Sequence, residues 1–130
     1  MKLSIYTSED TLRPEVLIIA TQEAYKTLSK LTIKKNESVK IPLKNLPNDF
    51  YTITLENCLI SYKENTQGLL DISINGKDFI IHGDAEALDH LIYYFGFMSE
   101  AESNYYWHID YYDGNSDVLE TNISLVLQTI

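Results

Sequence analysis

The 130-residue chain has the length of one domain, and 45% of its residues are hydrophobic, which excludes an intrinsically disordered protein. Its formal net charge is −9, and its single cysteine, Cys58, excludes an internal disulfide. The longest apolar runs fall far below the ~18 residues of a membrane span. The first residues also lack an apolar signal segment. We therefore expect a cytoplasmic protein that forms a single domain over residues 1–130.

The charge is unevenly distributed along the chain. All ten basic residues lie between Lys2 and Lys77, where nine acids leave a net charge of +1. Residues 78–130 hold ten acids and no lysine or arginine, a net charge of −10. Such a half repels nucleic acid and anionic membranes and attracts a basic protein. Solubility alone is the competing explanation of this asymmetry.

The first half predicts strands on either side of one helix. Alternating or β-branched runs at 2–6 and 15–20 indicate strands. Thr21 is placed as the N-cap of a helix that follows directly. A short edge strand is expected at 38–42, ended by Pro42. The runs 50–57 and 58–64 are expected to pair with each other across a turn near Glu56.

The second half predicts the same order of elements. Residues 69–76 and 77–83 read as a hairpin around Asn75-Gly76. Asp84 is placed as the N-cap of a helix whose apolar face includes Leu88 and Leu91, and Gly96 is expected to end it. Residues 105–112 alternate as a strand, with the odd positions buried and the even positions exposed. A last strand is expected at 123–128.

Both halves therefore read as hairpin, helix, hairpin, which suggests an internal duplication of residues 1–65 and 69–130. The segments 16–28 and 79–91 align at an offset of 63. The identical pairs are Ile18/Ile81, Glu23/Glu86, Ala24/Ala87 and Leu28/Leu91. The predicted fold class is α+β, with an antiparallel-rich sheet and two helices on one of its faces.

Catalytic and metal-binding patterns are weak in this chain. His108 and Asp110 share a face of the predicted strand, a spacing that suits a zinc ligand pair or a base and its orienting group. A hydrogen-bonded structural pair is the more common meaning of this spacing. Cys58 sits in an apolar strand, where thiols are usually inert. We therefore expect no metal, no cofactor and no enzymatic activity.

The stretch "NYYWHIDYYDGNSD" (104–117) combines five aromatic residues with one histidine, three aspartates and no lysine or arginine. Stacking on nucleic acid needs basic flanks, which are absent here. Tyrosine and tryptophan anchors ringed by acids suit a basic protein partner instead. Tyrosines that simply suit a half-buried strand are the alternative. The residues expected to contact the partner are Tyr106, His108, Asp110, Tyr112, Asp113, Asp117, Glu100 and Glu102.

The second half resembles immunity proteins of bacterial polymorphic-toxin and contact-dependent inhibition systems. The segments that carry this resemblance are "DFIIHGDAEALDHLIYYF", "YYWHIDYYDGNSD" and "TNISLVLQ". They cover about residues 70–130 and match a strand, a Gly-Asp helix start, a His-x-Asp strand and a closing aliphatic strand. The matching positions are Gly83, Asp84, Leu88, Leu91, His108, Asp110 and Ser124.

The resemblance implies a protein, monomeric or weakly dimeric, that binds a cognate basic toxin domain, for example a nuclease, and blocks it. A small acidic regulator or nucleic-acid mimic, such as a phage-encoded inhibitor, is the alternative from the residues alone. The third hypothesis for the function is an enzyme that uses His108 and Asp110.

Overall fold

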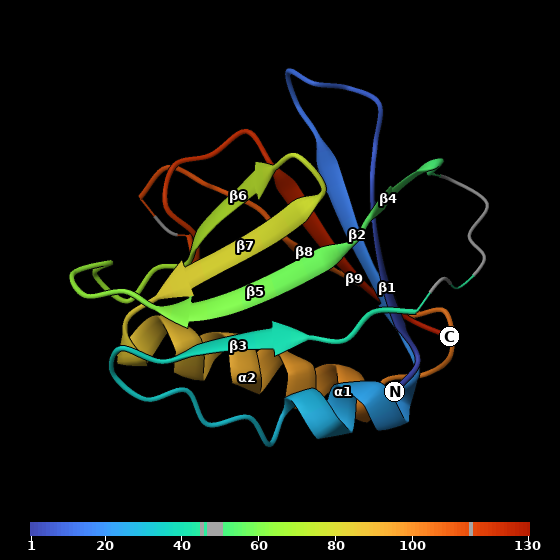
Figure 1. The fold of residues 1–130 in the computed structure, drawn as a ribbon, viewed down its shortest axis with the longest axis horizontal. Helices are drawn as coiled ribbons and strands as arrows, with labels where there is room; N and C mark the ends of the chain where they lie inside the picture. Colours follow the sequence, from blue (N-terminus) through green and yellow to red (C-terminus); the bar gives the residue numbers. More distant parts are fainter. Residues whose placement is uncertain (45, 47–50, 115) are drawn as a thin grey trace.

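The structure is a computed structural model that describes residues 1–44, 46, 51–114 and 116–130. Among these residues the chain forms two sheets and two helices (Figure 1), which confirms the predicted α+β class. The strands form two sheets instead of the single sheet that we expected. No helix in the described part of the chain is long and apolar enough to cross a membrane.

The five-stranded sheet joins strands from both ends of the chain. Its order is β4 (Ile53–Leu55), β1 (Leu3–Thr7), β2 (Glu15–Ala20), β9 (Ser124–Thr129) and β8 (Tyr106–Ile109). β1 and β2 pair antiparallel, β2 and β9 pair parallel, and β9 and β8 pair antiparallel. β1, β2 and β9 are buried on both faces, which suits their continuous apolar sequences.

The four-stranded sheet also takes strands from both halves. Its order is β3 (Ser38–Ile41), β5 (Asn57–Tyr62), β7 (Asp78–Gly83) and β6 (Asp71–Asn75). β6 and β7 form the predicted hairpin, and Gly76 takes the positive φ of 62° that its turn requires. β3 pairs with β5, and β5 runs parallel to β7.

The expected hairpin of residues 50–64 is wrong. β4 pairs with β1, whereas β5 pairs with β3 and β7, so Glu56 lies where the chain passes from one sheet to the other. The backbone N–H of Glu56 donates to the carbonyl of Lys77 at 2.8 Å, which fixes this crossing point. The first residue of the expected strand, Phe50, lies outside the described residues.

Both helices begin at the predicted N-caps. In α1 (Gln22–Leu28) the Thr21 hydroxyl accepts the N–H of Ala24, and in α2 (Ala85–Ser99) the Asp84 carboxylate accepts the N–H of Ala87. Gly96 does not end α2, because the buried Met98 continues the apolar face for another turn. The helices lie side by side along one side of the molecule (Figure 1) and contact each other.

The two sheets have equivalent strand orders. The series β1-β2-β9-β8 and β6-β7-β5-β3 show the same sequence of antiparallel, parallel and antiparallel pairings. β2 and β7 are offset by the 63 residues of the sequence alignment, and a helix follows each of them. Each half contributes its last strand pair to the other half's sheet. The internal duplication stays a prediction, and β4 has no counterpart among the four strands of the other sheet.

The largest core side chains come from both halves. They include Tyr25, Phe79, Phe95, Leu3 and Met98, all nearly inaccessible to solvent. The Tyr25 hydroxyl lies 3.0 Å from the carbonyl oxygen of Ile18 and 2.9 Å from that of Gln128, so this buried polar group is satisfied. A second, smaller cluster on the other face of the five-stranded sheet consists of Tyr6, Leu17, Ile19 and Val126.

Candidate functional site

A row of aromatic rings joins the last two turns of α2 to β8. Phe97 lies with its ring centroid 5.2 Å from that of Trp107 and 5.7 Å from that of Tyr105. Trp107 in turn lies 6.0 Å from Tyr94, and Tyr94 lies 6.1 Å from Tyr93. We call these five residues, Tyr93, Tyr94, Phe97, Tyr105 and Trp107, the aromatic ridge. Ring pairs at these separations attract one another and hold the row in place.

Much of the aromatic ridge is open to solvent. Tyr93 is 70% exposed, Phe97 41% and Tyr105 37%, while Tyr94 and Trp107 are half-buried. Large apolar side chains that gather on a surface mark interaction sites more often than scattered ones do. The ridge is therefore the strongest candidate for a binding surface on this chain.

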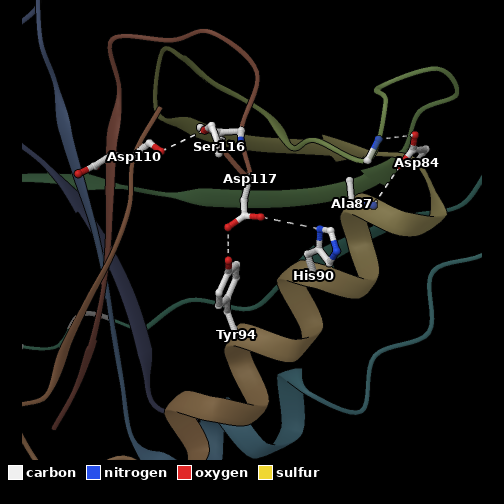
Figure 2. Close-up of polar contacts among 9 residues, drawn as sticks. Asp84, Ala87, His90, Tyr94, Asp110, Ser116 and Asp117 are labelled. Carbon is white, nitrogen blue, oxygen red and sulfur yellow. Dashed lines mark hydrogen bonds and ion pairs between the residues drawn. The ribbon is translucent and has the colours of Figure 1, made fainter. Parts of the chain in front are cut away.

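Three acidic residues, Glu100, Glu102 and Asp117, lie next to residues of the aromatic ridge. Glu100 follows α2 directly and Glu102 lies two residues further on, and both are exposed. The carboxylate of Asp117 accepts a hydrogen bond from the Tyr94 hydroxyl (Figure 2). Burial raises the pKa of Tyr94, and the neighbouring Asp117 raises it further, so this hydroxyl stays protonated at neutral pH. These elements contain no lysine or arginine that could neutralise the acids.

The eight residues predicted to bind a partner do not form one continuous face. Tyr106 and His108 are exposed on the side of β8 that faces away from the core. They line a hollow of about 240 Å³ together with Glu15, Leu17, Tyr51 and Val126. Trp107 and Ile109 point the opposite way, toward the core. The predicted alternation is therefore confirmed over residues 106–109.

The alternation fails at both ends of the predicted strand. Tyr105 is 37% exposed, and β8 ends at Ile109, so Tyr111 and Tyr112 lie outside it. Asp110, the first residue after the strand, is held by two hydrogen bonds. Its carboxylate accepts the Ser124 hydroxyl. Its carbonyl accepts the Ser116 hydroxyl at 3.1 Å (Figure 2). Tyr112 (62% exposed) and Asp113 lie in the loop that follows.

Asp117 also holds structure together. Its carbonyl accepts the N–H of Leu70 at 2.8 Å, and its carboxylate binds Tyr94 and lies 4.0 Å from Nδ1 of His90 (Figure 2). The loop before β9 is thereby attached to α2 and to the start of β6. Asp110 and Asp117 thus have internal partners, whereas Glu100, Glu102 and Asp113 are exposed.

Gly83 and Asp84, two of the positions that carry the family resemblance, serve the start of α2. The Asp84 carboxylate accepts the N–H groups of Ala87 and Gly68, each at 3.0 Å (Figure 2). The N–H of Asp84 donates to the Thr66 hydroxyl. The backbone hydrogen bonds from Ala87 and Gly68 lower the pKa of Asp84. A Cβ at Gly83 would lie 2.9 Å from the Cβ of Ala87, so glycine allows β7 to turn directly into the helix.

The cysteine and the three histidines do not gather at one place in the described residues. Burial raises the pKa of the Cys58 thiol to about 12, so the thiolate is scarce at neutral pH. His82, His90 and His108 lie on three elements, β7, α2 and β8. Across residues 1–44, 46, 51–114 and 116–130, no three His, Cys, Asp or Glu side chains are placed to hold a metal ion.

Sequence reasoning missed Tyr93 and Phe97, although the sequence contained a signal. The two residues are four apart and lie outside the apolar face that includes Leu88 and Leu91. Two aromatic residues on the side of a helix that should face solvent indicate a contact surface.

Fold and site together define a small α+β protein with an exposed aromatic surface in the half of the chain that lacks lysine and arginine. Comparison with family models, with curated proteins and with solved structures finds no match to this chain.

Proposed function

We propose that this protein is an immunity-type inhibitor that binds a basic toxin domain through the aromatic ridge and blocks it. The exposed ridge carries the proposal, since its rings lie among acids in a half of the chain without lysine or arginine. Aromatic anchors supply most of the affinity at such interfaces, and acidic neighbours speed the approach of a basic partner. The resemblance of residues 70–130 to immunity proteins supports the toxin as that partner.

Inhibition would work by occlusion. A domain that acts on nucleic acid needs exposed lysines and arginines to hold phosphates. Glu100, Glu102 and Asp113 are exposed and can meet such groups, while Tyr93, Phe97 and Tyr105 exclude water from the contact. The partner's basic surface would then be covered, so no chemistry is required of the inhibitor itself.

The test is protection of growing cells. The protein is co-expressed with a basic toxin domain encoded beside its gene, and growth and complex formation are measured. The double variant Tyr93→Ala/Phe97→Ala should lose protection and bind at least about 30-fold more weakly, because truncated aromatic anchors typically cost about 2 kcal/mol or more.

A matched control removes an apolar side chain far from the ridge. Leu12 is 78% exposed in the loop between β1 and β2, and Leu12→Ala should protect as well as the parent does. Loss of protection by both variants would contradict the assignment of the ridge. A tight complex that leaves the toxin active would instead favour the acidic regulator.

A further inference from the structure

A groove runs along the exposed side of α2 where that helix passes the end of α1. It has a volume of about 390 Å³ and is lined by Ser29, Ile92, Tyr93, Gly96, Phe97 and Glu100. Gly96 places no side chain in the groove, and the nearest neighbour of a Cβ built there would be Ser29 at 3.8 Å. The missing side chain at Gly96 leaves a depression on the helix surface, which Tyr93 and Phe97 also line.

The groove combines two aromatic rings with one carboxylate, a combination that suits a bound cation. Tyr93 and Phe97 are one turn apart, and both rings are exposed. Glu100, the C-cap residue of α2, lines the same groove and brings a carboxylate to it. Among the described residues, the Glu100 carboxylate has no hydrogen-bond or ion-pair partner.

We propose that the groove receives an arginine side chain of the bound protein. The guanidinium group stacks on the rings of Tyr93 and Phe97 and donates hydrogen bonds to Glu100, while its methylene stem lies over Gly96. Arginine fits better than lysine because its planar group both stacks on a ring and presents paired donors to a carboxylate. This inference rests on the proposed function and names the chemistry of the partner's anchor.

Lys26 and Lys30 are the basic residues nearest to Ser29 in the sequence, and neither lines the groove. Both are exposed, and their positive charges would weaken the binding of a cation in the groove. The double variant Lys26→Gln/Lys30→Gln should therefore bind a cation more tightly than the parent does.

Acetyl-arginine methylamide is titrated into the full-length protein, and the backbone amide shifts are recorded by NMR. The citrulline analogue, which is neutral and of nearly the same shape, is the control ligand. We expect saturable shifts of the Gly96 and Glu100 amides, with citrulline at least about tenfold weaker. Glu100→Gln should weaken arginine binding about three- to fivefold. The matched variant Glu56→Gln changes an exposed acid outside the groove and should leave arginine binding unchanged.

Gly96→Leu fills the hollow and should abolish the shifts, with the thermal midpoint recorded to verify folding. Equal shifts with arginine and citrulline would overturn the proposal, as would shifts that Glu100→Gln leaves unaltered. Groove shifts that depend only on protein concentration would also overturn it, because they would assign the groove to a second copy of this chain.

The two proposals fail separately. If the toxin complex forms but Glu100→Gln and Gly96→Leu bind it as the parent does, the groove assignment is wrong and the inhibitory function stands. If arginine binds the groove but no basic toxin domain is bound, the inhibitory function is wrong and the cation site stands.

Discussion

Asp84 shows at the scale of one residue how a side chain can serve two elements. Its carboxylate caps α2 through Ala87 and also binds the backbone N–H of Gly68, whose φ of 74° lies in the left-handed region. The helix start and the loop before β6 are thereby attached to one another. Removing the carboxylate should loosen both.

We expect Asp84→Ala to destabilise the protein by about 1 kcal/mol at pH 7, the usual effect of losing an N-cap. The hydrogen bonds from Ala87 and Gly68 lower the pKa of Asp84 from 3.8, so the charged form is the stabilising one. Its contribution is complete above the unfolded-state pKa and is lost as the pH falls through the folded-state pKa.

Urea unfolding at pH 7 and at pH 2.5 measures this dependence. The difference between the parent and Asp84→Ala should shrink at the lower pH. Asp84→Asn keeps an acceptor at the cap without the charge and serves as the control. An equal difference at both pH values would show that the ionised carboxylate contributes nothing.

At the scale of an element, the two glycines of α2 and its approach, Gly96 and Gly83, lie in different surroundings. Gly83 precedes the helix, where a Cβ would meet Ala87 at 2.9 Å and Leu70 at 3.3 Å. Gly96 lies inside the helix, where a Cβ would meet only ordinary contact distances. The same substitution should therefore have opposite effects at the two positions.

Gly96→Ala should stabilise the protein by about 0.5–1 kcal/mol, because alanine favours the helix more than glycine does. Gly83→Ala should destabilise it by about 1–3 kcal/mol through overpacking. Thermal unfolding of the two variants measures both effects. A loss of stability in Gly96→Ala would mean that the approach of α1 at Ser29 is tighter than 3.8 Å.

The elements themselves could be predicted from the sequence better than their partners could. Periodicity and caps indicated β2, the β6–β7 hairpin and both helix starts, because these depend on residues close together in the chain. The pairing of β4 with β1 instead of β5 could not be found this way, because alternation shows which face is buried and not which strand lies alongside.

The same limit applies to the candidate site. The exposure of Tyr106 and His108 follows from period two once their strand is recognised. The contact of Phe97 with Trp107 joins a helix to a strand across an intervening loop, and no local pattern contains it. Asp110 and Asp117 were expected to face solvent, yet serine and tyrosine hydroxyls distant in the sequence occupy their carboxylates.

At the scale of the whole molecule, the exchange of strand pairs makes the two halves depend on each other. β5 lies beside β7 of the second half, with β3 beyond it, while β9 lies beside β2 of the first half, with β8 beyond it. Neither half alone contains both neighbours of its own central strand. Neither should fold independently.

We expect fragments 1–64 and 65–130 to be largely unfolded apart and to form a native-like complex when mixed. The cut between Glu64 and Asn65 falls between exposed residues and leaves Thr66 and Gly68 with the helix that they contact. Circular dichroism of each fragment and of the mixture tests this. A fragment that melts cooperatively by itself would contradict the mutual dependence.

The central position of β9 also governs the order in which the chain can fold during synthesis. β9 is translated after every other strand, yet it lies between β2 and β8. At about 5–20 residues per second, the ribosome needs roughly 5–20 seconds to pass from the end of β2 to the end of β9. Throughout that interval the apolar edge of β2 has no strand beside it on the β9 side. The nascent chain therefore presents holding chaperones with a defined target, which disappears when β9 docks.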